Sequence, residues 1–261
     1  MALLETKDLG ITFDGLVALE GVDFSAEEGK ITAVIGPNGA GKTTFFNLVA
    51  GFYTPTQGSV SFEGKEITSL KAYQRAEAGI ARTFQNINLF KDMSVMDNAL
   101  VGLHCRSKSN ILSAMFRTPG QRKEEKQLRE EVMETLEFMG LAEYANEKAG
   151  SLSYGMQKNL EIARALALKP KVVLLDEPAS GLNTQDLDEL SKRILNIRDK
   201  GITVVLIEHK MDVVMSISDH IAVLNFGKKI ADGTPEEIRS NHEVIEAYLG
   251  KGASANARAN A

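Results

Sequence analysis

The stretch Gly36-Pro37-Asn38-Gly39-Ala40-Gly41-Lys42-Thr43, with Thr44 directly after it, is the part of the chain on which the rest of the fold depends. The run before it, Lys30-Ile31-Thr32-Ala33-Val34-Ile35, is short, apolar and rich in β-branched side chains, as in a buried strand. Residues 43–50 have helical composition and end at Gly51, a residue type that commonly follows a helix C-terminus. We therefore expect a strand, a glycine-rich loop and a helix in this order.

The loop fits the pattern G-x-x-x-x-G-K-[ST] of a phosphate-binding loop. Its glycines allow backbone N–H groups to converge on an anion without obstruction by Cβ atoms, and the helix N-terminus adds a favourable dipole. In this pattern Lys42 reaches the β- and γ-phosphates of a nucleotide, and the Thr43 hydroxyl is a ligand of Mg²⁺. The alternative is a glycine-rich turn with a chance lysine, although strand, spacing and helix all agree. We predict that ATP binds at Gly36, Pro37, Asn38, Gly39, Ala40, Gly41, Lys42, Thr43 and Thr44.

Composition limits the function classes. The 261 residues are 43% apolar, enough for a packed core, and the net charge is −5 with 30 basic and 35 acidic residues spread along the chain. This balance argues against nucleic-acid binding, which needs a clustered basic surface. The single Cys105 excludes an internal disulfide and fits a reducing cytosol. No apolar run approaches the roughly 18 residues of a membrane span, and the N-terminus lacks the features of a signal peptide, so we expect membrane partners to supply any membrane role.

The N-terminal third reads as strands separated by turns. Alternating apolar residues precede the turn at Asp14-Gly15, and a further short strand is expected at Val60-Ser61-Phe62. These segments predict a small, mostly antiparallel sheet beside the nucleotide. Phe13 can either present an aromatic face to a purine or belong to the core, and its position in a strand does not decide between the two.

After an expected strand over residues 79–84, helical patterns replace β-branched runs as far as about Gly150. A short helix is expected over residues 94–103, and residues 104–121 read as irregular, with a turn at Arg117-Thr118-Pro119-Gly120. Residues 121–139 predict an amphipathic helix, because Leu128, Val132, Leu136 and Met139 form one stripe. The charged run over residues 122–131 is interpreted as its solvated face. We interpret residues 93–152 as an inserted helical subdomain.

A further helix is expected to begin at Ser151-Leu152-Ser153-Tyr154-Gly155-Met156-Gln157. Small and hydroxyl residues at a helix start can expose backbone donors to an anion. The other interpretation is that Ser153 is an ordinary N-cap, and this stretch by itself favours it.

Two carboxylates end the apolar run Lys171-Val172-Val173-Leu174-Leu175-Asp176-Glu177, as at the C-terminal edge of a buried parallel strand. Asp176 is suited to bind Mg²⁺ directly or through water. Glu177 can orient and deprotonate an attacking water. A surface turn is the alternative, but four apolar residues ahead of it disfavour that interpretation.

The last third continues the same alternation of strands and helices. A helix capped by Asn183 and a strand over residues 202–207 precede His209, which either faces a γ-phosphate or has a structural role. A closing hairpin around Gly227 and a capping box beginning at Thr234 follow. Residues 251–261 have no packing pattern and are expected to be disordered.

Taken together, these motifs occur in the order of the ABC-transporter ATPases, and the resemblance extends to about Gly250. It implies an α/β P-loop (RecA-like) core, formed by residues 1–92 and 153–250, with an N-terminal antiparallel β subdomain and the helical insertion. It also implies roles for single residues. Phe13 resembles the aromatic residue that stacks on adenine, and Ser153 and Gly155 resemble the signature that closes over a partner's ATP. Gln85 resembles the residue that contacts water and Mg²⁺, and Asp176 resembles an Mg²⁺ ligand. Glu177 resembles the catalytic base, residues 180–183 resemble the D-loop, and His209 resembles the residue that contacts the γ-phosphate.

Two residues depart from the usual signature: Tyr154 stands in place of glycine and Met156 in place of glutamine. Ser153 and Gly155, which can approach a phosphate, are retained, so we expect function to survive. Several segments, such as Arg82-Thr83-Phe84-Gln85-Asn86 and Ile207-Glu208-His209-Lys210-Met211, resemble the ATP-binding subunits of high-affinity branched-chain amino acid importers (the LivG type). The assignment of the transported solute rests on this resemblance alone, since this type of subunit does not touch the solute. Importers of urea or other amides have similar ATPases.

The resemblance implies partners and a location. These are a second ATP-binding subunit, identical or paralogous, two integral-membrane permease subunits and, indirectly, a periplasmic solute-binding protein, at the cytoplasmic face of the inner or plasma membrane. A soluble ABC ATPase of translation or DNA repair is less compatible, because the chain has one P-loop and no long heptad stretch. A small-metabolite kinase would leave the 152–157 segment and His209 without a role.

Overall fold

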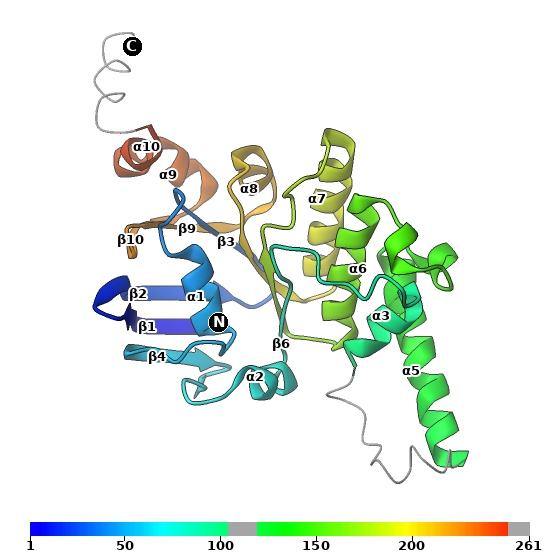
Figure 1. Ribbon diagram of the computed structural model, residues 1–261. Helices are drawn as coiled ribbons and strands as arrows, with labels where there is room; N and C mark the ends of the chain where they lie inside the picture. The colour runs from blue at the N-terminus through cyan, green and yellow to red at the C-terminus, as the bar shows by residue number, and fades with distance from the viewer. Residues whose placement is uncertain (104–118, 250–261) are drawn as a thin grey trace.

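Two β-sheets form the frame of the structure, a computed structural model that describes residues 1–103 and 119–249 (Figure 1). The first sheet is antiparallel, with the strand order β2-β1-β4-β5. Its strands are β1 (Ala2–Phe13), β2 (Leu16–Glu27), β4 (Gln57–Phe62) and β5 (Lys65–Glu66). The antiparallel sheet predicted at the N-terminus is therefore present.

The second sheet has the order β10-β9-β3-β8-β7-β6 and is parallel except for its edge strand β10. Its strands are β3 (Ile31–Ile35), β6 (Ile80–Arg82), β7 (Val172–Asp176), β8 (Thr203–Ile207), β9 (His220–Asn225) and β10 (Lys228–Gly233). Every residue of β3, β7 and β8 is buried, which explains why their sequences are nearly continuous apolar runs. The predicted α/β class with a P-loop core is confirmed.

Helix α1 (Lys42–Val49) lies between the two sheets. Its buried side chains Phe45, Phe46, Leu48 and Val49 share one apolar cluster with residues of both sheets. Phe45 also contacts Phe24 of β2 edge to face, with ring centroids 5.0 Å apart. The helix that follows the glycine-rich loop is thus fixed from both sides.

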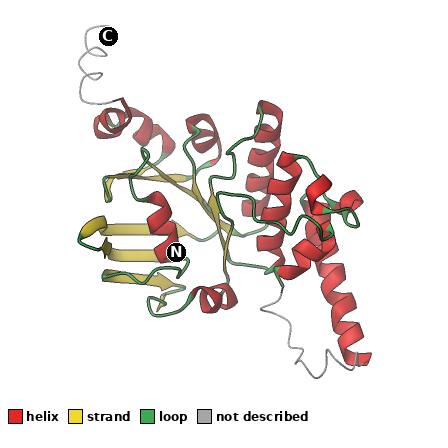
Figure 2. Ribbon diagram, viewed as in Figure 1, coloured by secondary structure: helices red, strands yellow, loops and turns green. Residues whose placement is uncertain are grey.

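The helices α3 (Val95–Val101), α5 (Pro119–Phe138) and α6 (Tyr154–Ala167) pack together at one end of the parallel sheet (Figure 2). Ser94 caps α3, as the expected short helix requires. The turn expected over residues 117–120 is wrong for Pro119 and Gly120, because both belong to α5. Proline is favourable at a first helical position, where the missing N–H has no helical partner in any case. The predicted stripe on α5 is buried at Val132 and Leu136 and continues to Met139 just beyond the helix.

The remaining helices lie along the sheet. They are α2 (Ala72–Ala78), α7 (Thr184–Asp199), α8 (Met211–Ile217), α9 (Pro235–Ser240) and α10 (His242–Leu249). Helix α2 lies beside β6, α7 beside β8, and α9 and α10 beside β10. The predicted caps are present: the Asn183 side chain accepts a hydrogen bond from the Asp186 N–H, and Thr234 forms a capping box with Glu237. Sequence patterns had not predicted α2, α8 or α10. Among the described helices, none is long and apolar enough to cross a membrane.

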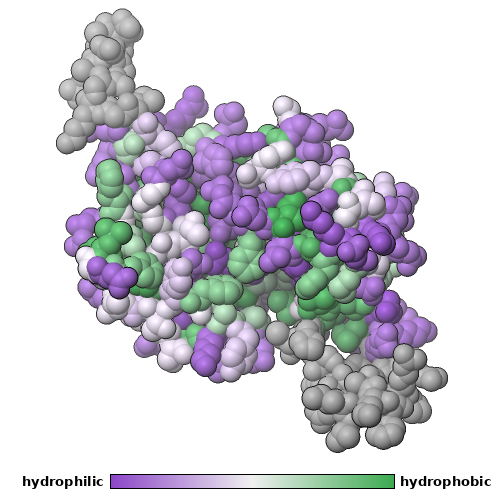
Figure 3. Space-filling view, in the orientation of Figure 1, coloured by the Kyte–Doolittle hydropathy of each residue, from purple (hydrophilic) through white to green (hydrophobic). Residues whose placement is uncertain are grey.

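The visible face in Figure 3 is mostly hydrophilic, with apolar side chains gathered over α3 and beside the ends of β2 and β10. Large exposed apolar residues near these strand ends include Leu16, Val17 and Phe226. The expected irregular segment from residue 104 to 118, with Cys105, and the expected disordered tail at residues 251–261 lie outside the described residues.

Candidate nucleotide site

The glycine-rich loop connects β3 to α1 and needs its glycines. Gly36, Gly39 and Gly41 all have positive φ angles, of 151°, 80° and 100°. A Cβ atom on Gly36 would lie 2.1 Å from the Leu224 carbonyl oxygen, and one on Gly41 would lie 2.9 Å from a methyl carbon of Leu19. No side chain fits at those two positions, so the loop backbone lies directly against β2 and β9.

Lys42 lies over the loop that precedes it. Its Nζ donates to the carbonyl oxygens of Gly36 at 2.7 Å and of Pro37 at 2.9 Å, and its side chain is buried. Burial lowers the pKa of Lys42, while the carboxylates of Glu177 and Asp176 act in the opposite direction. A buried ammonium group enclosed by a loop of backbone groups at a helix N-terminus is suited to bind a phosphate.

Asp176 ends β7 and has one oxygen in use and one without a partner. Its Oδ2 accepts a hydrogen bond from Nη2 of Arg82 at 2.9 Å, and its Oδ1 is buried with no hydrogen-bond partner among the described residues. Burial raises the pKa of Asp176, and the hydrogen bond and charge of Arg82 oppose this rise. Because an orphaned buried carboxylate oxygen is costly, it fits a bound cation or an ordered water.

Arg82 was missed by the sequence analysis. It also donates to Oδ1 of Asn47 on α1, at 2.7 Å, and its guanidinium lies 5.3–5.8 Å from the ring centroids of Phe46, Phe52 and Phe84. In the sequence, only the position of Arg82 at the end of a strand, three residues before Gln85, could have suggested that it belongs to the site. It joins β6, β7 and the loop helix at the site.

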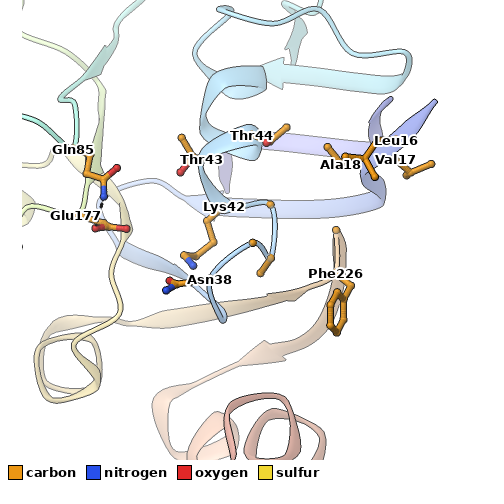
Figure 4. A pocket seen from close by; sticks show the side chains of 14 residues that line it. Leu16, Val17, Ala18, Asn38, Lys42, Thr43, Thr44, Gln85, Glu177 and Phe226 are labelled. Carbon is orange, nitrogen blue, oxygen red and sulfur yellow. Dashed lines mark hydrogen bonds between the residues drawn. The ribbon is translucent and has the colours of Figure 1, made fainter. Parts of the chain in front are cut away.

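Glu177, Gln85 and His209 meet beside the loop. Nε2 of Gln85 donates to Oε2 of Glu177 at 2.9 Å, and Nδ1 of His209 lies 3.7 Å from the same oxygen. Figure 4 shows Gln85 and Glu177 at one end of the pocket, near Lys42. Glu177 has a φ angle of 47°, and its N–H donates to the carbonyl of Ile207 at the end of β8. The three residues predicted from separate strand ends are thus adjacent.

A cavity of about 520 Å³ includes most of the predicted loop residues. Leu16, Val17, Ala18 and Phe226 line its far end, opposite Gln85 and Glu177 (Figure 4). These four were not singled out from the sequence, because Leu16, Val17 and Ala18 follow one turn and Phe226 lies in another, far away in the chain. The complete lining is Leu16, Val17, Ala18, Asn38, Gly39, Ala40, Gly41, Lys42, Thr43, Thr44, Gln85, Glu177, Phe226 and Gly227.

Seven predicted site residues are not part of this lining: Gly36, Pro37, Asp176 and His209, described above, and Phe13, Ser153 and Gly155. Phe13 is partly exposed and contacts Tyr53 edge to face, with centroids 5.3 Å apart. Ser153 caps α6 by accepting from the N–H of Met156 at 3.3 Å, so the N-cap interpretation holds for its hydroxyl. A Cβ atom on Gly155 would lie 3.0 Å from the carboxylate of Asp186, which leaves little room for a side chain.

The donors also bear on which metal fits. Within residues 1–103 and 119–249 there is no group of three or more histidine, cysteine, aspartate or glutamate residues that could hold a metal ion. A transition-metal site is therefore not formed by these side chains. One aspartate and threonine hydroxyls beside a phosphate site instead suit Mg²⁺, which keeps several waters and binds through few protein ligands.

A glycine-rich loop between β3 and α1, with Asp176 and Glu177 at the end of β7 in the same parallel sheet, defines a P-loop nucleotide-binding protein. Comparison with known families is more specific. The pattern of the ABC transporter family matches residues 19–180, and that of the branched-chain amino acid ATP-binding cassette transporter matches residues 228–254. The chain belongs to the ABC transporter family. Within that family it is a subunit that binds and hydrolyses ATP.

Individual relatives agree along the whole chain. The chain is 48% identical over 250 residues to the high-affinity branched-chain amino acid transport ATP-binding protein BraF of Pseudomonas aeruginosa, covering 95% of this chain and 98% of BraF. It is 43% identical, with the same coverage, to LivG of Escherichia coli, a protein of the same description. A nucleotide-free ATP-binding cassette from an ABC transporter has a TM-score of 0.84 at 35% identity, covering 96% of this chain and 100% of that one. A cassette in its ADP conformation has the same values.

Proposed function

We propose that this chain supplies the energy for an importer of branched-chain amino acids, by binding and hydrolysing ATP on the cytoplasmic side of permease subunits in the membrane. The observation that carries the site assignment is the Glu177 carboxylate, which lies between Gln85 and His209 at the edge of the cavity. The solute follows from the relatives BraF and LivG and from the C-terminal family match. An importer of urea or another amide is the alternative, and a soluble non-transport ABC ATPase a weaker one.

Each site residue has a different role in ATP binding or hydrolysis, set by its position. The loop amides and Lys42 bind the β- and γ-phosphates, and this orients the terminal phosphate toward Glu177. Glu177 accepts the proton of the attacking water, Gln85 holds the Glu177 carboxylate, and His209 contacts the γ-phosphate. Thr43, Gln85 and Asp176 are the residues that would hold Mg²⁺, with the unpartnered Oδ1 of Asp176 free for this role. Bound Mg²⁺ supplies neutralisation of phosphate charge.

The base can be tested by replacing Glu177 with glutamine. This substitution keeps the side-chain shape and an oxygen that can accept from Gln85, but it removes the proton acceptor. We expect unchanged ATP affinity and hydrolysis slower by at least ~10², the usual effect of a positioned general base. The measurement is steady-state ATPase activity of the subunit assembled with its permeases. Activity within threefold of the parent would exclude Glu177 as the base.

The solute is tested separately by uptake. Cells that lack the gene are complemented with the parent or with Glu177→Gln, and uptake of labelled leucine and of labelled urea is measured. The proposal requires leucine uptake that is restored by the parent and lost in the variant. Urea uptake with the same dependence, and no leucine uptake, would support the alternative.

We also propose that two ATP-binding subunits enclose the nucleotide. Ser153 and Gly155 lie at the N-terminus of α6 outside the cavity of their own subunit, so they are available to a second subunit's γ-phosphate. Phe13, beside Tyr53, is proposed to reach the adenine. The Glu177→Gln protein should dimerise with ATP and remain monomeric with ADP, which has no γ-phosphate. Light scattering that gives the same mass with both nucleotides would count against the arrangement.

For the permease, we propose docking on residues 85–95. Phe90 is 53% exposed and Leu89 is only partly buried, so this segment offers apolar side chains to an amphipathic helix of a partner. Phe90→Ala together with Leu89→Ser should reduce co-purification with the permeases and transport, while ATP binding is kept. Tyr73→Ala, at a similarly exposed aromatic residue on α2, is the matched control. Normal co-purification and uptake by the double variant would place the docking site elsewhere.

A further inference from the structure

The segment that follows β6 has an unusual source of hydrogen bonds. Residues 84–90 form neither helix nor strand, so their backbone groups cannot be satisfied by a regular ladder. At Gln85 and Asn88 the partners are three side chains of α6, Lys158, Glu161 and Arg164, whereas Asn98 of α3 supplies those of Phe90. The three α6 side chains are spaced by three residues and therefore project from one face of the helix.

Each of the three makes a direct contact with the backbone of this segment. Nζ of Lys158 donates to the carbonyl oxygen of Gln85 at 2.8 Å. Oε1 of Glu161 accepts from the N–H of Asn88 at 2.9 Å, and Nη1 of Arg164 donates to the carbonyl of Asn88 at 2.6 Å. Nη2 of Arg164 lies 3.8 Å from Oε1 of Glu161, which links the two side chains. We call these three residues the α6 clamp.

The clamp is buried and charged. Lys158 and Glu161 are 3% and 2% exposed. Burial lowers the pKa of Lys158, whereas the neighbouring carboxylates of Glu161, Glu208, Asp176 and Glu177 raise it. Buried charges are costly unless they are hydrogen-bonded, and here the bonds to the backbone of Gln85 and Asn88 supply those partners. The same arrangement places a cation near the carboxylates of the nucleotide site.

Gln85 is consequently held at two points. Lys158 holds its backbone carbonyl, and its side-chain amide donates to Oε2 of Glu177 at 2.9 Å. The amide group of a glutamine can be placed to within a few tenths of an ångström only if its backbone is fixed. No other side chain of the described residues contacts the backbone of Gln85 through a hydrogen bond.

We propose that Lys158, supported by Glu161 and Arg164, is a positioning residue for ATP hydrolysis, which fixes the backbone at Gln85 so that the Gln85 amide holds Glu177. The inference rests on the roles proposed above for Gln85 and Glu177. It makes α6, the helix that Ser153 caps, the element that sets the position of Gln85 in the same subunit.

The test is a double-mutant cycle in the subunit assembled with its permeases. Lys158→Met removes the donor, and Gln85→Ala removes the side chain through which the clamp acts. We expect Lys158→Met to lower kcat about 10- to 10²-fold, the usual loss from a displaced catalytic group, with the KM for ATP changed less than threefold. Lys158→Arg, which retains a donor, should recover most of kcat. Lys169→Met, at an exposed lysine just beyond α6, is the control and should leave kcat unchanged.

The cycle separates positioning from stability. If Lys158 acts through Gln85, adding Lys158→Met to the Gln85→Ala protein causes no further loss of kcat. If Lys158→Met lowers kcat by the same factor in the Gln85→Ala protein as in the parent, the proposal is wrong while the role of Gln85 stands. A Gln85→Ala protein with parental kcat would instead refute the role of Gln85 and the clamp together. Should Lys158→Met fail to fold, Lys158→Gln, which stays polar but is too short to reach the carbonyl, enters the same cycle.

Discussion

Replacement of the buried Arg75 by methionine is expected to lower the melting temperature of the protein markedly. Arg75 lies on α2, is 1% exposed, and donates only to backbone carbonyls. Nη1 donates to the carbonyls of Leu48 and Val49 at 2.7 Å each, at the C-terminal end of α1. Nε and Nη2 donate to the carbonyls of Leu70 and Thr68. The cation therefore caps the helix that begins at the nucleotide loop.

The magnitude follows from two opposing effects. Burial lowers the pKa of Arg75 to about 10, well below its ordinary value, so keeping the charge in the core itself costs about 3 kcal/mol. Methionine removes that cost, but it leaves the two fully buried carbonyls of α1 unpaired, at roughly 1–3 kcal/mol each, and removes two further bonds to a charged donor at about 1.5–3 kcal/mol each. The lost contacts amount to about 5–12 kcal/mol and outweigh the relief, so we expect a net destabilisation of at least about 2 kcal/mol.

For a chain of this length that destabilisation corresponds to a fall in melting temperature of at least about 4 °C. Differential scanning calorimetry of the isolated subunit measures it. Arg75→Lys, which keeps one donor group, should lose less than Arg75→Met. Arg129→Met, at an exposed arginine on α5 with only surface ion pairs, is the matched control and should shift the midpoint by less than about 2 °C. An Arg75→Met midpoint within that same margin would refute the reasoning.

Three further outcomes are expected. Lys42→Ala should weaken ATP binding by tenfold or more in a fluorescent-nucleotide titration, since a charged donor to the phosphates is lost; unchanged affinity would contradict its role. Chelation of Mg²⁺ with EDTA should stop hydrolysis, and activity that persists would argue against the proposed metal ligands. Gly58→Ala should destabilise far more than Gly64→Ala: both have φ near +75°, but a Cβ on Gly58 would lie 2.2 Å from the Asp8 carbonyl, and one on Gly64 meets nothing within 4 Å, so equal melting temperatures would contradict this packing.

Much of the fold was predictable because its signals are local. The runs that became β3, β7 and β8 are apolar on both faces of the sheet, and the polar residues that follow them mark the edge where the site lies. The caps at Asn183 and Thr234 involve residues only three positions apart. The position of Glu177 next to Gln85 follows from parallel neighbouring strands, whose C-terminal ends share one edge.

The rest could not be predicted, because it depends on contacts between distant parts of the chain. Arg82 and Asp176 are 94 residues apart in sequence, and nothing local distinguishes Arg82 from a surface arginine. Phe226 and Leu16 line the same cavity only because two hairpins meet there. Helix α2 was missed for a related reason: it is short, and its buried residue is a charged arginine, so it lacks an apolar stripe.

Buried charges hold this site together, and Glu208 shows how. Its side chain is fully buried at the end of β8, and burial raises its pKa while backbone donors lower it. Oε1 accepts from the N–H of Ala179 at 2.6 Å, and Oε2 from the N–H of His209 at 3.1 Å. One carboxylate thus joins the loop that follows Glu177 to the loop that carries His209. The distance between His209 and Glu177 is therefore set by an anion that itself has no place in the cavity, just as Lys158 sets the position of Gln85 from the opposite side.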